Sequence, residues 1–130
     1  MTPLGILLVA LGGAIGSVLR YGVSIAVAER FGLAFPYGTL VVNLTGSLCI
    51  GIVAGLAMRG DAGMTPELRL FLATGILGGF TTFSSFALEN LVLVRDGTPA
   101  VAVLYALGSL VLGVLAASLG MTVARAGAPH

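Results

Sequence analysis

The chain has 130 residues, of which 58% are hydrophobic and 8% are charged, and its formal net charge is +1. This composition predicts a single membrane-embedded domain over residues 1–130 that is not an enzyme, because one cysteine and one histidine exclude a zinc site and a Ser/His/Asp triad. The small net charge also excludes a nucleic-acid partner, which would need a clustered basic face.

Four apolar stretches follow one another along the chain, over about residues 4–28, 38–58, 68–94 and 99–124. Each has about the 20 residues that a helix needs to cross a hydrocarbon core of roughly 30 Å. No basic residue precedes the first stretch, which is also too long for the apolar core of a signal peptide, so we interpret it as a retained span. The sequence thus predicts an all-α membrane protein with four transmembrane helices and both termini on the same side.

The connections between these stretches are short and hold most of the charged residues. Pro36, Pro66 and Pro99 fall at predicted helix starts, where the missing amide of proline costs nothing. Thr65 and Thr98 precede two of these prolines and are predicted N-caps.

The first span contains one charged side chain, Arg20, near its end. An arginine at that depth is costly to insert, so it must reach an interface, find a partner or face water. Two interpretations are open. Arg20 either extends to the near membrane surface or provides a fixed positive charge that attracts anions to an aqueous vestibule.

The second span carries a polar stripe, because Thr39, Asn43 and Ser47 recur at intervals of four residues. This spacing predicts one helix face for all three side chains. An unpaired amide inside a membrane is expensive. Asn43 is therefore either part of a binding site or hydrogen-bonded to a neighbouring helix, which is common in membrane proteins.

The third span contains the most unusual segment, in which a Gly78-Gly79 pair is followed by hydroxyl residues alternating with phenylalanines. The hydroxyl residues are Thr81, Thr82, Ser84 and Ser85, and the aromatic residues are Phe80, Phe83 and Phe86. Glycines followed by hydroxyls predict a helix broken at Gly78-Gly79, whose freed carbonyls face protein or an ion. Ring edges and hydroxyls suit a small anion, and the carbonyls suit a small hard cation. The alternative is that glycines and hydroxyls serve only helix packing.

Three further polar residues lie in the third and fourth spans. Glu89 follows Phe86 by about one turn, and Tyr105 and Ser109 are four residues apart. Glu89 either binds a hydroxyl, lines a vestibule or is protonated. Tyr105 and Ser109 either extend a hydroxyl-lined track, or Tyr105 is an anchor at the membrane interface.

All six basic residues are arginines, and they are nearly balanced across the predicted membrane. The side of the termini has Arg59, Arg69 and Arg125, and the other side has Arg30 and Arg95, with Arg20 nearer this second side. The positive-inside rule therefore selects neither orientation. This balance favours a chain that inserts both ways and forms an antiparallel dual-topology homodimer, although a chain with so few charges can also balance by chance.

Three segments resemble those of the small bacterial fluoride channels of the Fluc/CrcB family, in the family's order and spacing. They are Gly12-Gly-Ala-Ile-Gly with Arg20-Tyr21, Gly38-Thr-Leu-Val-Val-Asn-Leu-Thr-Gly46, and Gly78-Gly-Phe-Thr-Thr-Phe-Ser-Ser-Phe86. The third segment is specific, and the resemblance extends over essentially the whole chain. It implies a multi-pass protein of the bacterial inner membrane that forms an antiparallel homodimer and passes fluoride passively out of the cytoplasm.

The resemblance also implies roles for particular residues. Phe83, Phe86 and Asn43 look like the groups that contact fluoride, and the backbone carbonyls of Gly78 and Thr81 look like the ligands of a structural Na⁺ at the dimer axis. Arg20 resembles the family's vestibule arginine. The remaining residues of the implied fluoride path are Thr39, Ser84, Glu89, Tyr105 and Ser109.

Two other functions are compatible with four short spans. A small proton-coupled multidrug or cation exporter needs a membrane-embedded carboxylate in its first span, where this chain has only Glu29 at the end. A structural membrane subunit without transport would use Phe83 and Phe86 for packing alone. Replacing these two residues would then affect assembly only.

Overall fold

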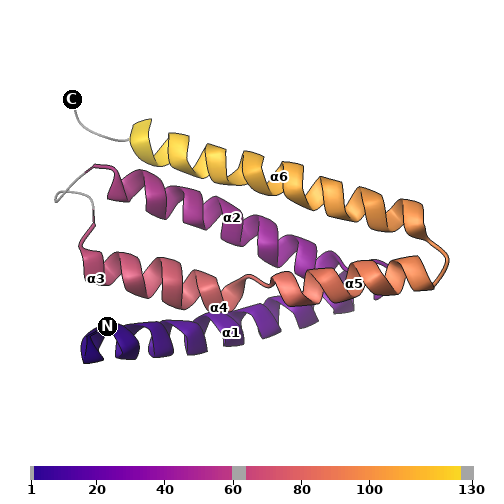
Figure 1. Ribbon diagram of the computed structural model, residues 1–130, viewed down its shortest axis with the longest axis horizontal. Coiled ribbons are helices and arrows are strands. Elements are labelled where there is room, and N and C mark those ends of the chain that lie inside the picture. Colours follow the sequence, from indigo (N-terminus) through magenta and orange to yellow (C-terminus); the bar gives the residue numbers. More distant parts are fainter. Residues whose placement is uncertain (1, 60–63, 127–130) are drawn as a thin grey trace.

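The computed structural model describes residues 2–59 and 64–126, and every regular element within them is a helix. The helices form four rods of transmembrane length, which run along a common axis in Figure 1. Three of them are α1 (Pro3–Phe31), α2 (Tyr37–Ala57) and α6 (Pro99–Ala126). The remaining rod consists of α3 (Pro66–Arg69), η2 (Leu70–Leu77), α4 (Gly78–Phe80) and α5 (Phe83–Arg95).

All four rods are long and apolar enough to cross a membrane, the third over Pro66–Arg95. The prediction of an all-α protein with four helices of transmembrane length is therefore confirmed. The start of α1 and the end of α6 lie at the same end of the molecule, together with the end of α2 and the start of α3 (Figure 1). The connections from α1 to α2 and from α5 to α6 lie at the opposite end.

Threonine hydroxyls cap the N-terminal ends of two of the rods. The Thr2 hydroxyl accepts the Gly5 amide at 3.1 Å, and the Thr65 hydroxyl accepts the Leu68 amide at 3.2 Å, so the predicted cap at Thr65 is confirmed. Thr98 differs from its prediction, because its hydroxyl donates to the Leu93 carbonyl at 2.8 Å. The Thr98 amide binds the same carbonyl at 2.9 Å, so both groups satisfy a carbonyl at the end of α5.

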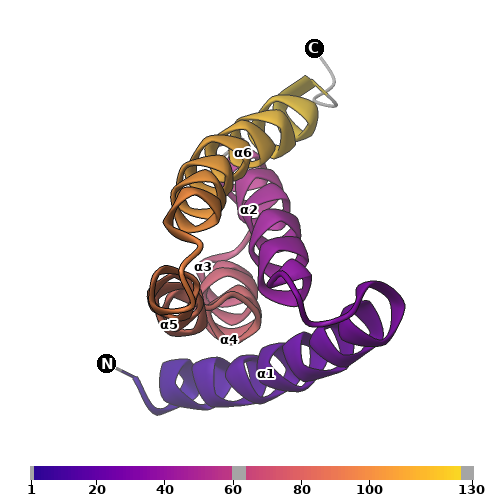
Figure 2. The same ribbon diagram turned by 90° about the vertical axis from the view of Figure 1, so that its right-hand side faces the viewer.

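The rods pack in pairs through glycines. α2 lies along α6, and α1 crosses below them against the third rod (Figure 2). A Cβ added at Gly51 or Gly120 would collide with a carbonyl oxygen of the facing helix, and one added at Gly16 would collide with the Ile76 carbonyl. Small residues allow such close backbone approach in membrane proteins, where apolar side chains gain little by leaving lipid.

The third rod changes its backbone geometry along its length. η2 is a π-helix of eight residues, and π-helical segments are rare and are frequently found at functional sites. After α4 the backbone of Thr81 and Thr82 is extended, with ψ of 157° and 118°, before α5 begins at Phe83. Our prediction of a break at Gly78-Gly79 is wrong in its position, because both glycines are helical.

Candidate functional site

The extended residues of the third rod are held by a side chain of α2. The Asn43 amide nitrogen donates to the Thr82 carbonyl at 2.9 Å, and the Thr82 amide donates to the Asn43 side-chain oxygen at 2.8 Å. The Asn43 side chain therefore forms the hydrogen bonds that a helical neighbour would otherwise form with the Thr82 backbone. Both bonds satisfy groups that would be costly to leave unpaired in a membrane.

This arrangement also accounts for two of the backbone carbonyls that the break leaves without a helical amide. In a continuous helix the Gly78 carbonyl would accept a hydrogen bond from the Thr82 amide, and the Thr81 carbonyl would accept one from the Ser85 amide. Here the Thr82 amide binds Asn43, and the Ser85 amide binds the Thr82 hydroxyl at 3.3 Å. The helix therefore ends at Phe80, one residue after the glycine pair, because Asn43 and the Thr82 hydroxyl bind amides that would otherwise continue it.

A cavity of about 370 Å³ lies beside these residues, and we call it the central cavity. Its polar lining residues are Asn43, Ser47, Thr81 and Thr82, and Gly78 and Phe83 also line it. The two residues predicted as sodium ligands and two of those predicted to contact fluoride are thus neighbours. None of the described residues forms a cluster of histidine, cysteine and carboxylates that could hold a metal ion, so only backbone and neutral oxygens are offered here.

Aromatic rings continue from the central cavity along α5. The ring centroids of Phe83 and Phe86 are 5.7 Å apart, and those of Phe86 and Tyr105 are 5.0 Å apart with an interplanar angle of 61°. Phe83 is 79% exposed, whereas Tyr105 is buried between helices. The ring of Tyr105 therefore links the two phenylalanines of α5 to α6.

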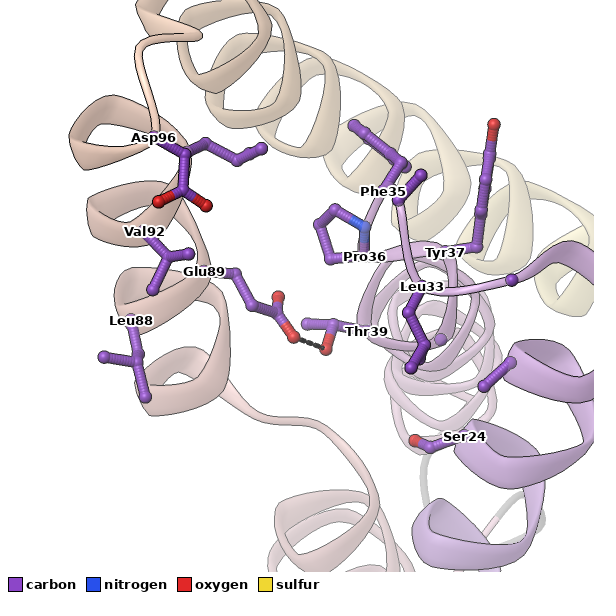
Figure 3. Close-up of a pocket in the computed structure, with 15 residues that line it drawn as sticks. Ser24, Leu33, Phe35, Pro36, Tyr37, Thr39, Leu88, Glu89, Val92 and Asp96 are labelled. Atoms are coloured by element: carbon purple, nitrogen blue, oxygen red, sulfur yellow. Dashed lines mark hydrogen bonds between the residues drawn. The ribbon is translucent and has the colours of Figure 1, made fainter.

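The Tyr105 hydroxyl leads to the one acidic residue inside the third rod's apolar stretch, Glu89. Tyr105 donates to one carboxylate oxygen of Glu89 at 2.8 Å, and the buried Thr39 hydroxyl donates to the other at 2.6 Å. Figure 3 shows Glu89 reaching from α5 toward Thr39 at the start of α2. Binding by hydroxyl groups is one of the interpretations that we left open for Glu89.

Glu89 and Thr39 line a second cavity, of about 410 Å³, which we call the loop-side cavity. It is enclosed by α1, the connection of residues 32–36, the start of α2, and α5 (Figure 3). Asp96 and Ser24 also line it. A cavity with mostly apolar walls thus extends from the connection of residues 32–36 to Glu89.

Three further predicted site residues line neither the central nor the loop-side cavity. Ser84 is exposed, and its hydroxyl is 3.4 Å from that of Thr82. Ser109 has a buried hydroxyl that lacks a hydrogen-bond partner among the described residues. Arg20 is half-buried on α1 and lines neither the central nor the loop-side cavity.

Thr82 is the central residue that our list of site residues omitted. It is 8% exposed, and its amide, carbonyl and hydroxyl groups all form hydrogen bonds with Asn43 or with serines of α5. The sequence contained an indication of this role, since an asparagine side chain is a carboxamide with N–H donors and a carbonyl acceptor, like a peptide group. Such a side chain in an apolar helix points to a neighbouring backbone that has lost its own partners.

Comparison with known proteins extends along nearly the whole chain. The sequence model described as "CrcB-like protein, Camphor Resistance (CrcB)" matches residues 7–121. A fluoride-specific ion channel FluC of Hyphomonas neptunium is 52% identical over 122 residues, which are 93% of this chain and 95% of the relative. A FluC of Thermus thermophilus is 54% identical over 114 residues, or 88% of both chains. A FluC of Rhizobium meliloti is 48% identical over 93% of this chain and 96% of the relative.

Proposed function

The chain belongs to the CrcB family of membrane proteins, and we propose that it is a fluoride channel that lets fluoride leave the cytoplasm and so lowers its toxicity there. The observation that carries this function is the near-full-length identity to fluoride-specific channels. The protein is a multi-pass protein of the bacterial inner membrane and a channel rather than an enzyme. A membrane potential that is negative inside drives anion exit without a coupled energy source.

The residues beside the central cavity fit a small, strongly hydrated anion. A selective path must replace the water around the ion with donors that converge on it. The Asn43 amide has two N–H donors, and the bond to Thr82 uses one of them, so the other can reach an anion in the central cavity. The edges of the Phe83 and Phe86 rings carry partial positive charge and can contact the ion without trapping it.

We propose that two copies assemble as an antiparallel dual-topology homodimer. Ser84 and Gly78 are exposed near the middle of the third rod, where a hydroxyl and a released carbonyl cannot face lipid without cost. Phe83 is also largely exposed beside them. A second copy that covers this face would shield the polar groups and would complete the wall of the path opposite Phe83.

We further propose that the carbonyl oxygens of Gly78 and Thr81 hold a structural Na⁺ between the two copies. Backbone carbonyls are suitable ligands for a small hard cation. The support for this choice is that these are the two carbonyls whose helical donors bind elsewhere. Replacing Na⁺ with N-methylglucamine in the buffer should then shift purified dimer toward monomer, while replacing chloride with gluconate should not.

A flux assay tests the channel function. Purified protein is reconstituted into liposomes with a potassium gradient, and valinomycin shunts the charge while ion electrodes follow fluoride and chloride. We expect rapid fluoride efflux and negligible chloride efflux. Folded dimer that releases no fluoride would contradict the proposal and would direct attention to proton-coupled cation export or to a structural role.

A further inference from the structure

One aromatic residue outside the third rod contacts the proposed path. Phe35 lies in the connection between α1 and α2, where the Tyr37 amide donates to the Phe35 carbonyl at 2.8 Å. Its side chain is half-buried and lines the loop-side cavity. It also lines a third cavity of about 260 Å³ beside α6, which contains Tyr105 and Ser109 and which we call the α6 cavity.

Phe35 is the residue that these two cavities have in common among the described residues. The ring therefore lies between a cavity lined by Glu89 and a cavity lined by Ser109. Figure 3 shows Phe35 across the cavity from Glu89.

The ring of Phe35 also orients Tyr105. The two centroids are 5.2 Å apart with an interplanar angle of 75°, an edge-to-face arrangement that aromatic pairs prefer. Phe35 also packs against Tyr37, with 4.8 Å between the two ring centroids. The Tyr105 ring thus contacts both Phe35 and Phe86, and in this position its hydroxyl donates to Glu89.

We propose that Phe35 is a positioning residue of the fluoride path, which fixes the Tyr105 ring and forms the wall between the loop-side and α6 cavities. This inference rests on the proposed channel function. An aliphatic side chain of similar bulk would keep the apolar contact but would lose the edge-to-face geometry. Tyr105 could then turn, and its hydroxyl would leave Glu89 and the path.

The test compares fluoride efflux from liposomes for Phe35→Leu, Phe35→Tyr and the control Phe31→Leu. Phe31 is a 62% exposed aromatic residue at the end of α1 that contacts Tyr37 but lines neither cavity. We expect Phe35→Leu to lower efflux by up to about tenfold, the size of one good aromatic pair. Phe35→Tyr keeps the aromatic ring and should have the efflux of the unmodified protein. Phe31→Leu should leave efflux unchanged.

A double-mutant cycle separates positioning from a general loss of packing. Tyr105→Phe removes the hydroxyl but keeps the ring, so adding Phe35→Leu to it should reduce efflux much less than Phe35→Leu does alone. Equal reductions in both backgrounds would overturn the inference, and so would wild-type efflux in Phe35→Leu. If Phe35→Leu yields no dimer, Phe35→Met takes its place with the same expectations. Absence of fluoride efflux from the unmodified protein would instead contradict the channel function itself.

Discussion

Asn43 and Thr82 are joined by two hydrogen bonds, one in each direction, across 39 residues of sequence. The asparagine side chain thereby supplies the donor and the acceptor that the extended backbone has lost. Because the same two bonds divert the Thr82 amide from Gly78, they determine where the helix ends. The shape of the candidate site therefore depends on a single side chain of α2.

Replacing Asn43 with alanine should cost both stability and flux. The Thr82 amide and carbonyl would be left unpaired inside the membrane, which destabilises a fold by about 1–3 kcal/mol per group. The loss should appear as a lower thermal unfolding midpoint in detergent and as absent fluoride efflux. Asn90→Ala is the matched control, because the Asn90 amide donates only within its own helix, to the Phe86 carbonyl at 2.9 Å. Equal effects of the two variants would contradict the special role of Asn43.

Phe83→Ile and Phe86→Ile should each abolish fluoride efflux and leave the yield of dimer largely intact. Isoleucine keeps the apolar bulk but has no ring edge to contact an anion. Size-exclusion chromatography reports the dimer, and the liposome assay reports the flux. Phe31→Ile, at another exposed aromatic position, should keep both. Unchanged efflux in both variants would contradict the proposal that the two phenylalanines contact fluoride.

The fold was largely predictable because four apolar stretches of membrane length leave few alternatives, and their predicted limits lie close to those of the helices. The position of the break in the third rod was not predictable from the sequence. The glycine pair invites a break by propensity, yet a helix ends where its amides find better acceptors, and that depends on Asn43 from a distant segment.

The candidate site was predictable in its residue types but only partly in its contacts. The spacing of Thr39 and Asn43 put them on one face of α2, but their partners on the third rod are 50 and 39 residues away. Phe35 carried no periodic signal, because it lies in a connection outside the helices. Its contact with Tyr105 arises only from the way the connection folds over α6.

Thr39→Val should weaken the packing of α2 against α5. Valine has the shape of threonine, but it leaves one carboxylate oxygen of Glu89 without its donor at 2.6 Å. We expect the free energy of unfolding to fall by about 1–3 kcal/mol. We also expect lower fluoride efflux, since Glu89 lines the loop-side cavity. Thr45→Val, at an exposed position of the same helix, should change neither quantity. Full efflux and stability in Thr39→Val would show that the bond is dispensable.

Gly16→Ala should separate α1 from the third rod. The added methyl group would meet the Ile76 carbonyl and would lie 2.8 Å from the Phe80 amide nitrogen, so the helices must move apart. Overpacking of this kind costs about 1–3 kcal/mol, which a lower unfolding midpoint would report. Gly22→Ala is the control on the same helix, since nothing lies within 4 Å of a methyl group there. A midpoint lowered equally by both substitutions would point to the helix itself rather than to the contact.

Removing arginines from one end of the molecule should shift the orientation in which the chain inserts. Arg69 and Arg125 are exposed, whereas Arg59 donates to the Ala124 carbonyl and would disturb the packing if replaced. Because the arginines are nearly balanced, Arg69→Gln with Arg125→Gln should bias insertion toward one topology, and Arg30→Gln with Arg95→Gln toward the other. Reporter fusions at the C-terminus measure the two populations. Mixing the two oppositely biased chains should restore fluoride efflux that each lacks alone, since an antiparallel dimer needs both orientations. Full activity of a chain locked in one orientation would contradict the antiparallel arrangement.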